Sequence, residues 1–120
     1  MGYHPRQESK TQPSFITTRS RNSRLWFVNN PELEQAILGH LAKCLARRGA
    51  KIYAFAIEGN HNQAPVLFPE GNRSDFMRDL NSAIARAVER YTPEYNGGRF
   101  WGRRYSAEVL PGERDLEEYF

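Results

Sequence analysis

Arginine and aromatic residues alternate in one short segment, residues 99–105, which reads Arg-Phe-Trp-Gly-Arg-Arg-Tyr. Guanidinium groups pair with phosphates and aromatic rings stack on bases, so this combination suits binding of a single-stranded nucleic acid. A solvated basic surface whose aromatic residues belong to the core would produce the same pattern. The residue types alone leave both interpretations open.

Charge is distributed unevenly along the 120 residues, which carry 17 basic and 14 acidic side chains and a formal net charge of +3. Residues 1–60 hold nine basic and four acidic side chains, whereas residues 112–120 hold one basic and four acidic ones. Further basic clusters lie at 19–24 and 47–51. The basic part of the chain favours an anionic partner such as a nucleic acid.

Composition also excludes several classes of protein. The chain is long enough for one domain, and it has no apolar run near the roughly 20 residues that cross a membrane. Its single cysteine, Cys44, excludes an internal disulfide and a two-cysteine zinc site, and its helical spacing with apolar residues predicts a core thiol. We therefore expect a cytoplasmic protein without a membrane partner. Residues 1–13 are polar and are predicted to form a disordered arm.

The elements that must position the basic and aromatic residues follow from hydrophobic periodicity and turn residues. Asn30-Pro31-Glu32 is typical of a helix start, and Arg47-Arg48-Gly49 of a helix end. A second helix is predicted to have Ser74 as its N-cap and to end near Thr92-Pro93. Strands are predicted at 14–20, 51–58, 61–68 and 105–110, and residues 115–120 are predicted to begin a third helix.

Two of these strands carry a more detailed prediction. In the first, Phe15 and Thr17 should lie on one face and Ile16 and Thr18 on the other. In the third, Pro65 weakens the strand assignment, because proline cannot donate to a ladder and is confined to edges or bulges. The order strand, helix, strand, strand, helix, strand predicts an α+β, ferredoxin-like βαββαβ fold, with an antiparallel sheet and two helices on one face.

Four short segments of the chain, taken together, form a recognisable pattern. They are 52–61 (IYAFAIEGNH), 68–72 (FPEGN), 80–86 (LNSAIAR) and 99–105 (RFWGRRY). In this order, within residues 15–120, the chain resembles the single-tyrosine HUH transposases, and the REP-associated tyrosine transposases in particular. The resemblance implies binding of single-stranded, hairpin-containing DNA, with strand cleavage and rejoining through a phosphotyrosine intermediate. It also implies a divalent metal, Mg²⁺ or Mn²⁺, and leaves a homodimer open.

The resemblance assigns the catalytic parts to particular residues. The family carries His, a bulky hydrophobic residue and His on one strand, where this chain reads His61-Asn62-Gln63. His61 and Gln63 are therefore the metal ligands that the resemblance implies, and Glu58 could approach the metal from across the hairpin or be an ordinary exposed carboxylate. The family tyrosine should fall about two residues beyond Phe120, and Tyr119 is the nearby substitute. We thus expect 14–120 to be a transposase domain truncated at the start of its C-terminal catalytic helix.

The same resemblance points to DNA contacts from Arg19, Arg99, Trp101, Arg103 and Arg104, although Trp101 could instead fill the core. Three functions are compatible with these residues. The first is a transposase whose cleavage activity is impaired. The second is a catalytically inactive, domesticated or remnant single-stranded-DNA-binding module. The third is a small structural or regulatory domain without a nucleic-acid role.

Overall fold

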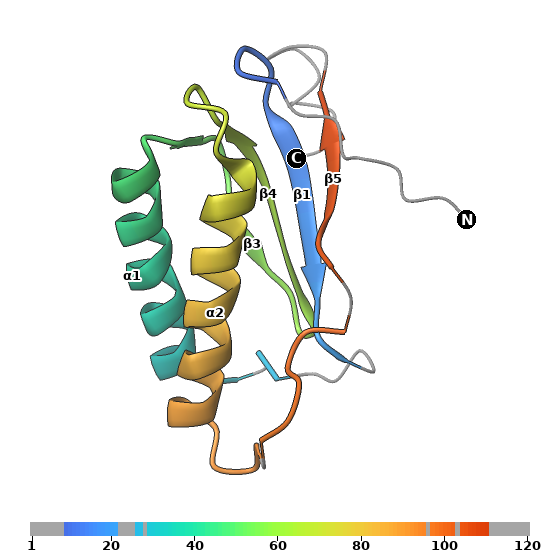
Figure 1. Cartoon of the computed structure of the whole chain (residues 1–120). Helices are drawn as coiled ribbons and strands as arrows, with labels where there is room; N and C mark the ends of the chain where they lie inside the picture. The colour runs from blue at the N-terminus through green and yellow to red at the C-terminus, as the bar shows by residue number, and fades with distance from the viewer. Residues whose placement is uncertain (1–8, 22–25, 28, 96, 103, 111–120) are drawn as a thin grey trace, which may run out of the picture.

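The computed structural model describes residues 9–21, 26–27, 29–95, 97–102 and 104–110. Two helices lie side by side on one face of an antiparallel sheet (Figure 1). The strand order is β2-β4-β1-β5, and β3 also pairs with β4. With β2 and β3 taken as two parts of one strand, this is the predicted ferredoxin-like arrangement. The elements are β1 (Ser14–Arg19), α1 (Pro31–Arg48), β2 (Lys51–Ile52), β3 (Ala56–Ile57), β4 (His61–Leu67), α2 (Arg73–Tyr91) and β5 (Ser106–Val109).

A β-bulge interrupts the strand predicted at 51–58, so the prediction of one continuous strand was wrong. Ile52 pairs with Val66 and Ala56 with Gln63, which leaves residues 53–55 opposite only residues 64–65. Such an extra residue defines a bulge and changes which face the following residues occupy. It lies beside Pro65, as the sequence predicts for a strand proline.

The predicted helix boundaries are largely confirmed. The Asn30 side chain accepts a hydrogen bond from the Leu33 N–H at 3.1 Å, and Gly49 ends α1 in the left-handed conformation with φ 63°. The prediction of Ser74 as the N-cap of α2 was wrong, because Asn72 occupies that position without a side-chain capping bond. Instead, the Asn72 amide donates to the Arg48 carbonyl at 2.9 Å and joins the start of α2 to the end of α1.

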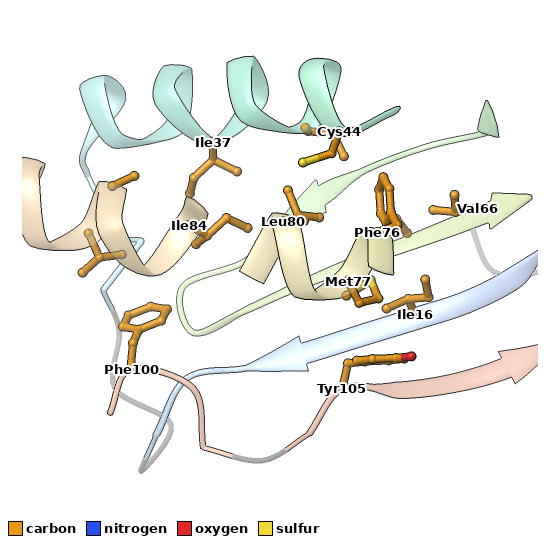
Figure 2. Packing of buried hydrophobic residues seen from close by; sticks show 14 of the residues in the cluster. Ile16, Ile37, Cys44, Val66, Phe76, Met77, Leu80, Ile84, Phe100 and Tyr105 are labelled. Atoms are coloured by element: carbon orange, nitrogen blue, oxygen red, sulfur yellow. The ribbon is translucent and has the colours of Figure 1, made fainter. Parts of the chain in front are cut away.

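Apolar side chains from the helices and the sheet meet in one core (Figure 2). Ile37 of α1 and Ile84 of α2 are completely buried between the helices, and Val66 of β4 is buried beneath them. Cys44 is also buried, and burial, followed by the nearby Asp79, raises the pKa of its thiol. The prediction of a core thiol is confirmed. Among the described residues, no helix is long and apolar enough to cross a membrane.

An ion pair joins the two helices at the edge of this core. Arg48 of α1 donates from Nη2 and Nε to Asp79 Oδ2 of α2, at 2.7 and 3.1 Å. This hydrogen bonding from Arg48 is the main reason why the pKa of Asp79 is lowered. The ionised carboxylate is therefore favoured in the folded chain.

Removing the Asp79 charge is expected to make the stability of the fold less sensitive to acid. Because the pKa of the Asp79 carboxyl is lower in the folded than in the unfolded chain, its charge contributes its full stabilisation above the unfolded pKa of about 3.9. This stabilisation is lost as the pH falls below that value and the carboxyl becomes protonated. Between about pH 4 and about pH 2, the wild type should lose more unfolding free energy than Asp79→Asn, as urea denaturation at each pH would measure. Asp75→Asn is the control, because its pair with Arg78 is more exposed. Equal acid sensitivity in wild type and Asp79→Asn would contradict the prediction.

Candidate metal and DNA site on the open face of the sheet

The face of the sheet opposite the helices carries the sequence-predicted metal ligands. Arg19 of β1 pairs with His61 of β4, and Thr17 pairs with Gln63. Cross-strand partners project to the same face, so these four side chains lie together, and we call this surface the open face. Their neighbours along each strand are buried toward the helices. The predicted alternation of the first strand is confirmed.

Asn60 organises His61 and Arg19 at the end of the hairpin. Its Oδ1 lies 2.8 Å from His61 Nδ1 and accepts a hydrogen bond from Arg19 Nη1 at 3.3 Å. An amide oxygen only accepts hydrogen bonds, so His61 Nδ1 is the donor in this contact, which leaves Nε2 as the ring nitrogen that could bind a metal. Such a carbonyl partner is what orients metal-binding histidines in proteins. Asn60 is thus a candidate site residue that its sequence position, in a Gly-Asn turn, did not reveal.

The donor set around His61 fits a weakly held divalent ion. Gln63 lies two residues along the same strand and supplies an amide oxygen, a ligand that hard ions accept. The Glu58 N–H donates to the His61 carbonyl at 2.8 Å, which places Glu58 opposite His61 at the hairpin end. Within the described part of the chain, no cluster of three or more His, Cys, Asp or Glu residues could hold a metal. A metal here would therefore depend on the neutral Gln63.

Trp101 lies on the other side of the sheet from His61. Its segment runs beside the end of β1, since Gly102 N–H donates to the Arg19 carbonyl at 3.1 Å. The indole Nε1 donates to the Asn81 carbonyl of α2 at 2.8 Å, and the ring packs against Phe100 with centroids 4.6 Å apart. This half-buried residue has a packing role and keeps part of its surface exposed.

The arginines predicted to contact DNA also lie on different surfaces of the molecule. Arg104 is exposed and lines a groove beside α2 together with Trp101, whereas Arg19 belongs to the open face. Arg99 is exposed in the segment before β5. Arg103 and Tyr119 lie outside the described residues, as do the predicted third helix and residues 1–8 of the predicted arm. The structure thus divides the predicted DNA-binding residues between two surfaces.

Comparisons with a family model and with solved structures all match this chain to transposases. The chain matches the family described as "Transposase IS200 like" over residues 14–119, and no curated protein is similar to it. Its fold is similar to that of a REP-associated tyrosine transposase bound to a REP hairpin, with a TM-score of 0.79, 17% identity and coverage of 99% of this chain and 68% of that one. It is also similar to a crystal structure described as a transposase of Deinococcus radiodurans R1, with a TM-score of 0.68, 16% identity and coverage of 98% and 95%. Since the family match spans nearly all of the described sheet and helices, the chain belongs to the IS200-like transposase family.

Proposed function

We propose that the open face binds single-stranded DNA that carries a hairpin, in a transposase whose strand-cleavage step is weakened by Gln63. The observation that carries this proposal is the convergence of His61 and Arg19 on Asn60, at the open face of the sheet. Arg19 is exposed and always charged, so it can pair with a backbone phosphate next to the imidazole. The similar protein bound to a REP hairpin supports this class of substrate.

In the proposed reaction, the Tyr119 hydroxyl is the nucleophile. Its oxygen forms a bond to the phosphorus of the scissile phosphate, and the bond from phosphorus to the 3′-oxygen breaks. The phenolic proton passes to water, and the released 3′-oxygen takes up a proton to give a free 3′-hydroxyl. Reversal of these steps rejoins the strand. A divalent ion held by His61 and Gln63, with Glu58 nearby, would neutralise charge on the phosphate.

A binding module without catalysis is the second candidate function. It is favoured by the position of Gln63, where the resemblance implies an imidazole, because a neutral amide is a weaker ligand. Arg19 and the arginines around residue 100 would retain their affinity for phosphate in this case. The two candidates share DNA binding and differ only in the covalent step.

Arg19→Ala is expected to weaken binding of single-stranded DNA about five- to tenfold at low salt. It should also reduce the slope of log affinity against log salt by about 0.7, because one contact to a phosphate of the single strand is lost. Fluorescence anisotropy with a labelled unpaired oligonucleotide would measure both quantities. Arg90→Ala is the matched control, since it removes an exposed arginine from α2. If both variants bind like the wild type, the open face is not the DNA-binding surface.

A further inference from the structure

Glu58 lies directly opposite His61 at the end of the hairpin. Ile57 pairs with Asn62 in the register of β3 against β4, and the next residue continues this register, because the Glu58 N–H donates to the His61 carbonyl at 2.8 Å. Cross-strand partners project to the same face of a sheet, so the exposed Glu58 side chain belongs to the open face. On that face, His61 is therefore flanked by Arg19 on one side and by Glu58 on the other.

The turn that joins the two residues is held by the rest of the fold. The Gly59 carbonyl accepts a hydrogen bond from the Phe27 N–H at 3.0 Å, and the Asn60 carbonyl accepts one from the Ser20 N–H at 2.9 Å. The Asn60 side chain also contacts Nδ1 of His61 and leaves Nε2 for a metal. The backbone on both sides of the candidate site is thus fixed before an ion binds, which reduces the entropy that binding costs.

Glu58 is closer to His61 than the predicted ligand Gln63 is. Directly opposite residues of an antiparallel pair have Cβ atoms about 5 Å apart, whereas residues two apart on one strand are separated by about 6.7 Å. Oxygen ligands suit Mg²⁺ and Mn²⁺, and a carboxylate adds a negative charge that an amide lacks. Among the described residues, Glu58 takes part in no ion pair, so its carboxylate is available to a cation.

We propose that Glu58 is a direct ligand of the divalent ion and takes the place of the strong second ligand that Gln63 does not provide. The inference rests on the proposed function, in which Glu58 is only a neighbour of the ion. His61 Nε2 and the Glu58 carboxylate hold the ion from the two strands of the hairpin, and Gln63 is the weaker third ligand.

This assignment couples DNA binding to the ion. Without a metal, the Glu58 carboxylate repels a phosphate bound near Arg19, and this repulsion ends once the carboxylate holds a dication. Mn²⁺ should therefore tighten the binding of a single-stranded oligonucleotide to the wild type about fivefold. In EDTA, Glu58→Gln should bind the oligonucleotide about twofold more tightly than the wild type, and it should lose most of the response to Mn²⁺.

Titration of the whole chain with MnCl₂, in the absence of DNA, tests the assignment directly. Electron paramagnetic resonance of free Mn²⁺ would measure the affinity, which Glu58→Gln should lower about tenfold or more. Glu70→Gln is the matched control, because it removes the same charge from an exposed turn beyond the other end of β4. Its affinity should stay within about twofold of the wild type. Thermal melts followed by circular dichroism would confirm that both variants are folded.

Glu58→His distinguishes a ligand from a nearby charge. It removes the same charge as Glu58→Gln but supplies a nitrogen ligand opposite His61. If Glu58 is a ligand, Glu58→His should bind Ni²⁺ about tenfold more tightly than Glu58→Gln, since imidazole suits this ion. Equal affinities of these two variants for Ni²⁺ would show that Glu58 acts only through its charge, and the assignment would fail.

Failure of this inference and failure of the proposed function give different results. If the wild type binds the oligonucleotide, but Glu58→Gln binds Mn²⁺ as tightly as the wild type, the inference fails and the proposed DNA binding stands. The inference also fails if the wild type binds no Mn²⁺. If the wild type binds Mn²⁺ through Glu58 but binds no oligonucleotide with or without the ion, the proposed function fails and the ligand assignment stands.

Discussion

Gln63→His is expected to increase the affinity for Mn²⁺ about tenfold or more. The substitution places a second imidazole two residues from His61 on the same strand and the same face, and imidazole is a stronger ligand than a neutral amide. The cross-strand neighbours of Gln63 are Thr17 and Ala56, both small enough to leave room for the ring. Isothermal titration calorimetry with MnCl₂ would measure the gain.

Leu67→His provides a matched control for this experiment. Residue 67 lies on the same strand and the same face as Gln63, but four residues further on, or about 13 Å away. A histidine there cannot share an ion with His61, so its affinity for Mn²⁺ should equal that of the wild type. Adding His61→Ala to Gln63→His should remove the gain. If Gln63→His binds Mn²⁺ no more tightly than Leu67→His, His61 is not a metal ligand.

The same variant separates the two candidate functions. With a hairpin-containing single strand and Mn²⁺, the transposase function predicts that Gln63→His forms more covalent protein–DNA adduct than the wild type. The adduct, detected by denaturing gel electrophoresis, should disappear when Tyr119→Phe is added, because the phenolic oxygen is the proposed nucleophile. Improved metal binding without any adduct would leave DNA binding as the function of this chain.

Asn62→Leu is expected to stabilise the fold by about 1–3 kcal/mol. Asn62 lies between His61 and Gln63 but faces the helices, where it is 6% exposed. None of the described residues offers a hydrogen-bond partner to its Oδ1 or Nδ2. Burying unsatisfied polar atoms costs this amount, and a leucine would pack against Leu41 and Leu80 around the same small cavity. The resemblance also places a bulky hydrophobic residue at this position.

Urea denaturation would measure this gain, and a thermal melt should show an increase of several degrees. Gln63→Leu is the matched control, since it replaces an amide by the same apolar side chain on the other face of the strand. Its effect should stay within about 0.5 kcal/mol of zero. A stability of Asn62→Leu at or below that of the wild type would show that Asn62 is satisfied in the folded protein.

Local patterns predicted the helices and the fold because each signal lies within a few residues. Asn30 begins α1 and Gly49 ends it, each through a bond to a nearby residue, and the alternation around Ile16 predicted which residues of β1 share a face. The N-cap of α2 was missed because Asn72 bonds to the distant Arg48 carbonyl, a tertiary contact that no local pattern contains. The interruption of the strand at 51–58 likewise depends on a partner strand.

The candidate site shows the same division between local and distant information. The alternation of His61 and Gln63 could be predicted, because residues two apart on a strand share a face. The role of Asn60 could not, since it needs Arg19, which is 41 residues away in the sequence. Likewise, Arg19 and Arg104 were both predicted from the sequence to contact DNA, whereas in the fold they lie on different surfaces.

The bulge at 53–55 connects two sequence positions that would evolve together. The Tyr53 N–H donates to the Pro65 carbonyl at 3.1 Å, so the Pro65 nitrogen, which points to the same side of its strand, also faces the bulge. Deleting one residue from 53–55 would restore regular pairing and bring a backbone carbonyl opposite a nitrogen that has no proton. In relatives of this chain, we therefore expect the extra residue and the proline to be gained or lost as a pair.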